Sequence, residues 1–185
     1  MPHEYGIETP ANKIATAQAV LSLALRLSGE VEGGRINRDI FGREVIVHTG
    51  DKGVKVSAFL NGTQEDLKRG ISNIVLIALS ASALTVDETL DEVFGSIASE
   101  SDQNRKSIRV MVNQLRNAFA HNPWRPKWLV YPKYRNVYPF ELCDGTRFEF
   151  DARSLNGDGI KPEQIGGLEI WVKLLHHCEG AVAQS

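Results

Sequence analysis

The sequence predicts a mainly helical protein with two small β-hairpins. Apolar residues recur every three or four positions, the spacing of a helix face, in four segments: about 10–28, 64–84, 103–121 and 162–179. β-Branched and aromatic residues alternate with polar ones in two further segments, near 40–60 and 128–152. These patterns favour one domain, residues 1–185, built as a bundle of four or five helices into which both hairpins are inserted.

Size and composition agree with one soluble domain. The 185 residues are enough for a well-buried core, and 42% hydrophobic and 24% charged residues are ordinary values for a globular protein. Residues 1–10 lack the basic start and the apolar centre of a signal peptide. The longest apolar run, residues 74–86, is shorter than the ~20 residues that a membrane span needs. We therefore expect a cytoplasmic protein with no membrane segment.

The net charge of −2 conceals a basic segment. Residues 102–135 contain a single acidic residue, Asp102, and carry a net charge of +7, whereas the other 151 residues carry −9. Such an asymmetry indicates a polyanionic partner more clearly than the total charge does. The basic residues of the segment are Arg105, Lys106, Arg109, Arg116, Arg125, Lys127, Lys133 and Arg135.

The first helix is expected to begin at Thr9-Pro10 and to end at Gly29. Threonine is a suitable N-cap, and proline is tolerated at the first helical position. Residues 43–48 and 54–59 then form two alternating strands, and the sequence Thr-Gly-Asp-Lys-Gly between them favours a turn. We expect the first hairpin there.

A second helix over about residues 64–84 is expected to follow a turn and cap at residues 61–63, Asn-Gly-Thr. Its second half is apolar nearly all round, which is typical of the central helix of a bundle. A short acidic helix over residues 87–94 should come next. The predicted buried side of the second helix consists of Ile71, Ile74, Val75, Ala78 and Leu79.

The helix over about residues 103–121 carries the most useful chemistry. Ser101 or Asp102 is its expected N-cap. Pro123 disfavours helix at the residue before it, so His121 should lie in the last turn. The expected buried stripe consists of Ile108, Val112, Leu115 and Phe119.

The carboxy-terminal part should hold the second hairpin and the last helix. Residues 137–142 and 146–152 are the expected strands, and Asn-Gly-Asp-Gly at residues 156–159 is a turn. The last helix should span about residues 162–179. Its expected core face consists of Ile165, Leu168, Trp171, Val172 and Leu175.

A second, polar face of the 103–121 helix is the candidate functional site. Arg116 is always charged and can hold two phosphate oxygens, whereas His121 titrates near neutrality and can donate or accept a proton. Asn117 can orient either side chain, and the helix dipole favours the imidazolium form of His121. A small residue at position 120 lets another surface approach. The face comprises Arg109, Asn113, Arg116, Asn117 and Ala120, with His121 at its edge.

The spacing of Arg116 and His121 is not sufficient evidence by itself. Arg43 and His48 have the same separation, but in a predicted strand an odd separation puts their side chains on opposite faces. A structural alternative also stays open for the helix pair. In it, Arg116 is a solvated charge and His121 bonds the last carbonyls of the helix.

Metal and disulfide chemistry are not indicated. Cys143 and Cys178 are too few for a disulfide framework and have no metal-type spacing. In His-His-Cys at residues 176–178, neighbouring helical side chains diverge by about 100°, and no other ligands lie close in sequence. We therefore expect no metal and no cofactor. If the polyanionic partner is RNA, the substrate's own 2′-hydroxyl can serve as the nucleophile, so that no nucleophilic side chain of the protein is needed.

Residues 116–121, Arg-Asn-Ala-Phe-Ala-His, resemble the R-x4–6-H motif of the HEPN superfamily, in which a polar residue, often asparagine, follows the arginine. The position late in a long helix of a bundle is similar too, and the resemblance covers the helical segments but not the hairpins. It implies an HEPN-like fold and a metal-independent endoribonuclease. In that case, His121 is the acid/base, Arg116 stabilises the phosphate and the transition state, and Asn117 supports them.

The resemblance also implies partners. HEPN proteins of this kind are commonly toxins of toxin–antitoxin pairs or effectors in antiphage defence. They usually form homodimers in which two motifs make one composite active site, and a nucleotidyltransferase-like antitoxin is then a candidate partner. Because many members are non-catalytic, a non-catalytic RNA- or protein-binding dimer stays open, as does a purely structural or regulatory dimer.

The segment over residues 123–135 is expected to contact RNA. Base stacking on aromatic rings beside phosphate-binding cations is a common way to hold single-stranded nucleic acid. The alternative role for the aromatic residues is to pack the hairpin onto the bundle, and we favour this role for Trp124 and Trp128. The predicted RNA-binding residues are Arg109, Asn113, Arg125, Lys127, Lys133, Tyr134 and Arg135.

Overall fold

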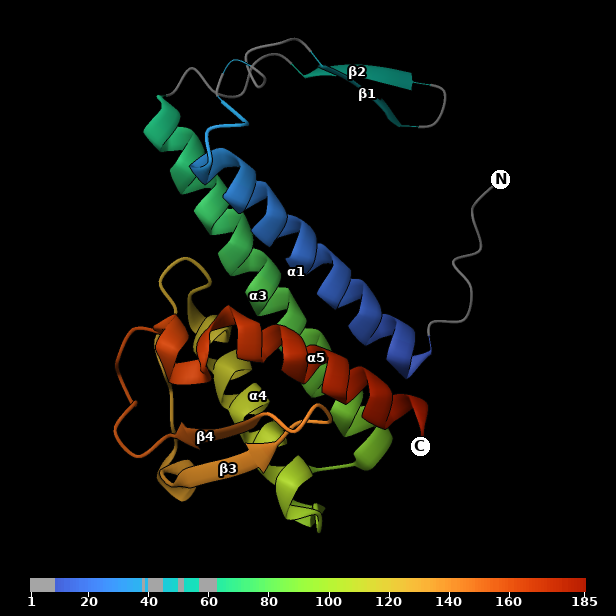
Figure 1. Cartoon of the computed structure of the whole chain (residues 1–185), viewed down its shortest axis with the longest axis vertical. Helices are drawn as coiled ribbons and strands as arrows, with labels where there is room; N and C mark the ends of the chain where they lie inside the picture. Colours follow the sequence, from blue (N-terminus) through green and yellow to red (C-terminus); the bar gives the residue numbers. More distant parts are fainter. Residues whose placement is uncertain (1–8, 38, 40–44, 50–51, 57–62) are drawn as a thin grey trace. The chain divides into compact units, whose positions relative to one another are not determined.

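The computed structural model describes residues 9–37, 39, 45–49, 52–56 and 63–185. These residues contain four α-helices and two antiparallel hairpins, which confirms the predicted mainly helical fold with small β decorations (Figure 1). The helices are α1 (Pro10–Glu32), α3 (Gln64–Phe94), α4 (Gln103–His121) and α5 (Gly167–Ala183). The strands are β1 (Val45–Thr49), β2 (Lys52–Val56), β3 (Val137–Glu141) and β4 (Arg147–Asp151).

The chain divides into two compact units. We call residues 1–21 and 77–185 the larger unit, and residues 22–76 the smaller unit. Helices α1 and α3 each contribute residues to both. The candidate functional residues of α4 and of the loop after it belong to the larger unit, and the single-domain organisation stays a prediction.

The smaller unit has its own apolar core, formed by the end of α1 and the start of α3. This core consists of buried Val31, Leu67 and Ile71, with Leu27 and Ile36 packed against them. The burial of Val31 explains why α1 continues past Gly29, its predicted end. Burying the valine side chain stabilises by about 1.5–3 kcal/mol, which outweighs the ~1 kcal/mol that glycine costs inside a helix.

Side chains cap the starts of both long helices as predicted. Thr9 Oγ1 accepts a hydrogen bond from the backbone N–H of Asn12 at 3.2 Å. Thr63 and Asp66 form a reciprocal pair, in which the Thr63 N–H donates to the Asp66 carboxylate at 2.8 Å and the Asp66 N–H donates to Thr63 Oγ1 at 3.3 Å. Four stretches of the predicted strands and turns lie outside the described residues: 43–44, 50–51, 57–59 and 61–62.

Helix α3 runs without interruption to Phe94, so the predicted separate helix over residues 87–94 is wrong. Nothing between the two segments breaks a helix, and Val86 and Leu90 are both buried, so one continuous helix keeps both apolar faces packed. The predicted burial of Ile74 is also wrong, because this residue is 45% exposed. Among the described helices, α3 alone is long and apolar enough to cross a membrane, with a mean hydropathy of 1.6 over an 18-residue window. Length and hydropathy do not by themselves indicate a membrane span, because core helices of soluble proteins have the same properties.

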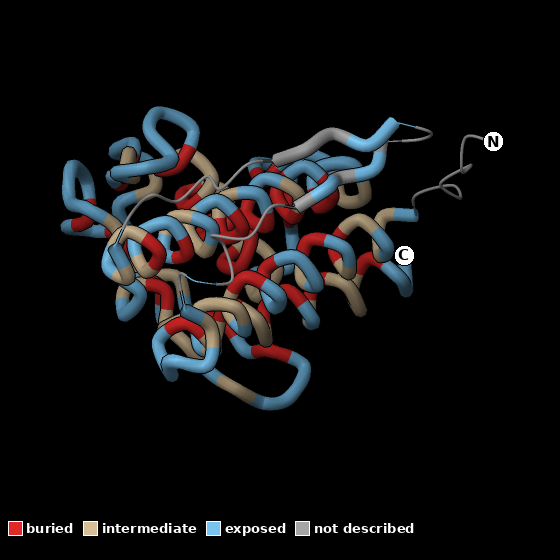
Figure 2. The backbone as a smooth tube through the Cα atoms, turned by 90° about the horizontal axis from the view of Figure 1, so that it is seen from above, coloured by how far each residue is buried: buried red, intermediate tan, exposed pale blue. Residues whose placement is uncertain are grey.

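Helix α4 buries about half of its 19 residues in the larger unit. Asp102 is its N-cap and accepts from the backbone N–H of Arg105 at 2.9 Å. Helix α5 lies across α3 (Figure 1), where the indole N–H of buried Trp171 donates to the Ser82 hydroxyl at 2.9 Å. Figure 2 shows how buried positions recur along the helices. Those of α4 include the predicted stripe and three more apolar residues: Ile108, Val112, Leu115, Phe119, Val110, Met111 and Ala118.

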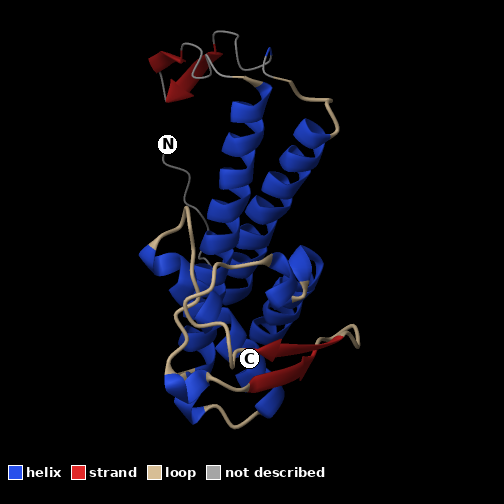
Figure 3. Cartoon of the chain, turned by 90° about the vertical axis from the view of Figure 1, so that its left-hand side faces the viewer, coloured by secondary structure: helices blue, strands red, loops and turns tan. Residues whose placement is uncertain are grey.

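The β3–β4 hairpin forms as predicted and packs on α4 (Figure 3). The side-chain amide of Asn104, in the first turn of α4, pairs with the backbone of Glu141. It accepts the Glu141 N–H at 2.7 Å and donates to the Glu141 carbonyl at 2.9 Å. On the other strand, the ring of buried Phe150 lies 5.5 Å from that of Trp128. These contacts fix the hairpin against the helix that carries the candidate site.

The last helical segment is broken at Gly166, so the predicted continuous helix over residues 162–179 is wrong. Pro162–Ile165 form a 3-10 helix, and α5 begins after Gly166, which has a left-handed φ of 76°. A Cβ at Gly166 would lie 2.7 Å from the side chain of Ile170 and 2.8 Å from that of Phe148. Of the predicted core face, Leu168 and Val172 are half-buried, and the fully buried residues are Ile165, Trp171 and Leu175.

Replacing Gly166 by alanine should lower the free energy of unfolding by about 2 kcal/mol or more, because the new methyl group meets both backbone strain and a close contact. Gly145→Ala is the matched control. Gly145 has a φ of 80°, and a Cβ added there would have no atom within 4 Å, so only backbone strain of about 1 kcal/mol is expected. Urea denaturation measures both losses. Equal losses would contradict the role of the close contact.

Candidate functional site

A ring of four polar side chains joins α3 to α4 in the larger unit. The amide N–H group of Asn113 donates to both carboxylate oxygens of Asp87, each at 3.2 Å. Asn117 Nδ2 donates to Asn113 Oδ1 at 3.1 Å, and Arg116 Nη1 donates to Asn117 Oδ1 at 3.0 Å. The ring closes where Arg116 Nε lies 3.8 Å from Asp87 Oδ2. The guanidinium is therefore held from two sides.

The orientation of the two amides in this ring follows from its charged members. A guanidinium can only donate hydrogen bonds, and an ionised carboxylate can only accept them. Asn113 and Asn117 must therefore direct oxygens toward the Arg116 side and N–H groups toward the Asp87 side, as the hydrogen bonds require. Burial raises the pKa of Asp87, although the hydrogen bond from Asn113 opposes this change. Acidification would consequently protonate Asp87 more readily than an exposed aspartate and remove the anchor of the ring.

Arg116 and His121 both remain open to a ligand. The Arg116 side chain is 40% exposed, so its outer N–H groups can reach a phosphate while the inner ones stay in the ring. His121 is exposed in the last turn of α4. Five helical positions place the two side chains about 140° apart around the helix axis. The two side chains of one copy of the chain therefore point in clearly different directions from α4.

Two members of this environment, Asp87 and Gln114, are not predicted by the sequence pattern. The pattern places Asp87 only in a short acidic helix, although a carboxylate directly after buried Val86 is typical of a charge that needs a partner. Gln114 is fully buried, and its Nε2 donates to Asn113 Oδ1 at 3.3 Å. Within the described part of the chain, Gln114 Oε1 is the one buried side-chain oxygen or nitrogen without a partner.

The predicted RNA-binding roles of Arg109 and Asn113 do not agree with their positions. Arg109 is 1% exposed and donates to Asp91 Oδ1 at 2.6 Å, to Glu100 Oε2 at 3.1 Å and to the Gly95 carbonyl. Asn113 is turned toward Asp87. This part of the polar face meets carboxylates of α3 and of the α3–α4 connection, so its charges are used inside the protein.

The loop after α4 exposes most of its predicted RNA-binding side chains. The Lys133 ammonium lies 4.8 Å from the centre of the half-buried Tyr134 ring, and Arg135 Nε donates to the Val130 carbonyl at 3.3 Å. Trp128 is buried as favoured, and its indole N–H donates to Gln164 Oε1 at 2.8 Å. The packing role favoured for Trp124 is wrong, because this residue is 57% exposed. The cations of the loop are all exposed: Arg125, Lys127, Lys133 and Arg135.

The cysteines and the carboxy-terminal histidines have structural contacts. Both thiols are free, and burial raises the pKa of Cys178 to about 12. His177 Nδ1 accepts from the backbone N–H of Cys143 at 3.0 Å, whereas His176 lies 3.8 Å from Glu179 on the outer side of α5. The described residues contain no group of three or more His, Cys, Asp or Glu side chains arranged to hold a metal.

The chain matches no protein-family model, and no curated protein or solved structure is significantly similar to it. The resemblance of residues 116–121 to the HEPN motif therefore stays a prediction. Support for a function comes from the ring of Asp87, Asn113, Asn117 and Arg116, which we call the Asp87–Arg116 ring. The exposed His121 and the basic loop after α4 add to this support.

Proposed function

We propose that this protein is a metal-independent endoribonuclease of HEPN type. The RNA 2′-hydroxyl attacks the adjacent phosphorus, so the P–O2′ bond forms while the P–O5′ bond breaks. Imidazolium His121 gives its proton to the leaving 5′ oxygen. Arg116 donates to the non-bridging phosphate oxygens, where negative charge increases in the transition state. The products are a 2′,3′-cyclic phosphate and a 5′-hydroxyl.

The observation that carries this proposal is the fixed guanidinium of Arg116. An exposed arginine on a helix normally samples many rotamers, and ordering it on a ligand costs up to ~2 kcal/mol of side-chain entropy. Here Asn117 holds Nη1 at 3.0 Å and Asp87 lies 3.8 Å from Nε, while 40% of the side chain stays accessible. A preorganised donor is what electrostatic stabilisation of a transition state requires.

A homodimer completes the proposed site. Arg116 and His121 diverge around α4, so a second copy would supply the histidine that takes the 2′-hydroxyl proton. Ala120 is exposed between them and allows close approach of the two helices. For the biological role, we propose a toxin or an antiphage-defence effector. It would act in the cytoplasm and would be regulated by a nucleotidyltransferase-like antitoxin.

The test is cleavage of RNA in the presence of EDTA. We expect cleavage at an unchanged rate after metal removal, with 2′,3′-cyclic phosphate on the upstream product. An oligonucleotide of the same sequence with 2′-deoxy sugars is the matched control and should stay intact, because it lacks the nucleophile. Cleavage of the deoxy strand, or dependence on added metal, would contradict the mechanism.

A non-catalytic RNA-binding dimer is the second candidate, and the cations of the loop after α4 favour it. In this case, binding should weaken steeply with salt, because each phosphate contact releases counterions. Lys133→Ala and Arg135→Ala should reduce the affinity, whereas His121→Ala should leave it unchanged. RNA that stays intact in the presence of excess protein would distinguish this candidate from the nuclease.

A further inference from the structure

Trp124 differs from the two other tryptophans of the chain in its surroundings. Trp128 and Trp171 are 1% and 0% exposed, whereas Trp124 is 57% exposed. Each buried indole donates its N–H group to a side-chain oxygen, at 2.8 Å to Gln164 and at 2.9 Å to Ser82. Folding therefore accounts for Trp128 and Trp171, but it does not account for a large apolar ring held in solvent at position 124.

The backbone presents Trp124 directly after the proposed active site. The Asn122 side-chain oxygen accepts from the backbone N–H of Trp124 at 3.0 Å and of Arg125 at 3.1 Å. Pro123 fixes one dihedral angle of the same turn. The indole is thus held three residues beyond His121, on a backbone with little freedom, which lowers the entropy lost when the ring is covered.

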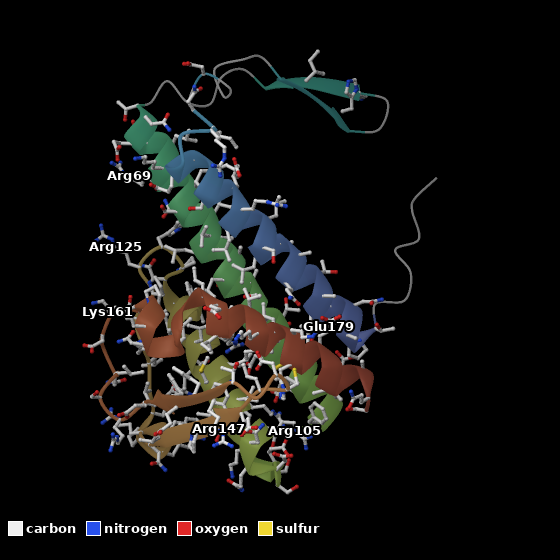
Figure 4. All side chains as sticks on the ribbon, viewed as in Figure 1. Arg69, Arg105, Arg125, Arg147, Lys161 and Glu179 are labelled. Carbon is white, nitrogen blue, oxygen red and sulfur yellow. The ribbon has the colours of Figure 1, made fainter. Side chains whose placement is uncertain are left out.

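Cations surround this turn. The Ile160 N–H donates to the Pro126 carbonyl at 3.2 Å, and Lys127 forms an antiparallel bridge with Gly159, so the segment around Lys161 runs beside the Arg125–Lys127 segment. Figure 4 shows Arg125 and Lys161 extending from the ribbon on the same side of the view. Residues 122–136 include four basic and no acidic residues. The acidic residues on the facing segment are Asp158 and Glu163.

We propose that Trp124 stacks on an unpaired nucleobase of the RNA next to the bond that is cleaved, and that Arg125, Lys127 and Lys161 bind the flanking phosphates. The substrate is therefore single-stranded. A base inside a duplex is already stacked on both faces, whereas an unpaired base can turn onto an aromatic side chain. The charge of the loop fits a polyanion better than a protein surface of mixed charge. The position of the cleaved bond rests on the proposed nuclease function, but the stacking itself does not.

The intrinsic fluorescence of the protein gives a direct test, because Trp124 is its exposed indole. The probe is a single-stranded oligoribonucleotide with 2′-O-methyl groups, which bind but cannot attack phosphorus. We expect this strand to quench and shift tryptophan emission, and the same strand annealed to its complement to have little effect. Trp124→Phe should abolish the emission change, since both remaining indoles are buried.

Affinity measured by anisotropy of the labelled strand separates stacking from charge. Trp124→Ala should weaken binding about tenfold, because a base–aromatic stack of this kind accounts for roughly 5- to 150-fold in affinity. Trp124→Phe keeps a flat ring and should bind within about threefold of the wild type. Leu84→Ala removes an apolar side chain that is 40% exposed on α3, and Arg147→Gln removes an arginine side chain that is 82% exposed on β4. Neither control should change the affinity.

Equal emission changes with the duplex, or unchanged affinity in Trp124→Ala, would overturn the stacking proposal even if RNA is cleaved in EDTA. Conversely, quenching by the single strand that disappears in Trp124→Phe supports stacking, whether or not the protein cleaves RNA. No change in emission or anisotropy with either strand would also overturn it. The binding measurement and the cleavage assay can therefore fail independently.

Discussion

Replacing His121 by alanine should lower the rate of RNA cleavage by about 100-fold or more, while changing the free energy of unfolding by less than about 0.5 kcal/mol. The imidazole is exposed in the last turn of α4, so its removal leaves no cavity. General acid–base groups typically contribute a rate factor of about 10² to 10⁴. Single-turnover cleavage in EDTA measures the rate, and urea denaturation measures the stability.

Arg116 provides the second half of the same prediction. Arg116→Ala should cause a comparable loss of cleavage, and Arg116→Lys should recover only part of it, because an ammonium cannot donate to Asn117 and to a phosphate with the same planar geometry. His176→Ala is the matched control, since His176 is an exposed histidine on α5. If His121→Ala and His176→Ala cleave at the same rate, His121 has no catalytic role.

The extent of α4 could be predicted because each of its signals is local. Asp102 supplies the cap, the stripe from Ile108 to Phe119 follows the helical period, and Pro123 stops the helix. The inward orientation of Arg109 could not be predicted in this way. Its place on the helix made it part of the polar face, but its partners, Asp91 and Glu100, reach it only through the tertiary fold.

The missed continuity of α3 and the missed break at Gly166 have opposite causes. In α3, tertiary burial of Val86 and Leu90 extends one helix across a stretch that looked like two. At Gly166, the break depends on the close approach of Phe148 from strand β4, a contact between residues distant in sequence. The Asp87–Arg116 ring was missed for the same reason, since it joins two helices.

Arg109→Ala should lower the free energy of unfolding by about 3–5 kcal/mol, the second large effect that we expect. Both partners of the Arg109–Glu100 ion pair are buried, with side chains 1% and 2% exposed. Removal of the guanidinium leaves one buried carboxylate with fewer donors and the Gly95 carbonyl without its donor. Arg105→Ala is the matched control. It contacts the same carboxylate at 2.6 Å, but its side chain is 34% exposed, so water can replace it and a smaller loss is expected.

The cause of the loss can be separated from simple loss of volume by changing the carboxylate as well. Arg109→Met combined with Glu100→Gln removes the unpaired charge, so the double variant should be more stable than Arg109→Met alone. Hydrogen bonds from the Arg105 side chain, the Asp102 backbone N–H and the Arg109 side chain, in decreasing order of effect, lower the pKa of Glu100 from 4.5 to about 2. A lowered pKa in the folded protein stabilises it at pH values above 4.5, and this contribution is lost as the pH falls toward 2. Urea denaturation across that range should show a smaller loss in Glu100→Gln than in the wild type; some loss should remain, because the pKa values of Asp144 and Asp151 are also lowered to about 2. The same pH dependence in both would mean that other carboxylates, rather than the Glu100 cluster, determine the acid stability of the larger unit.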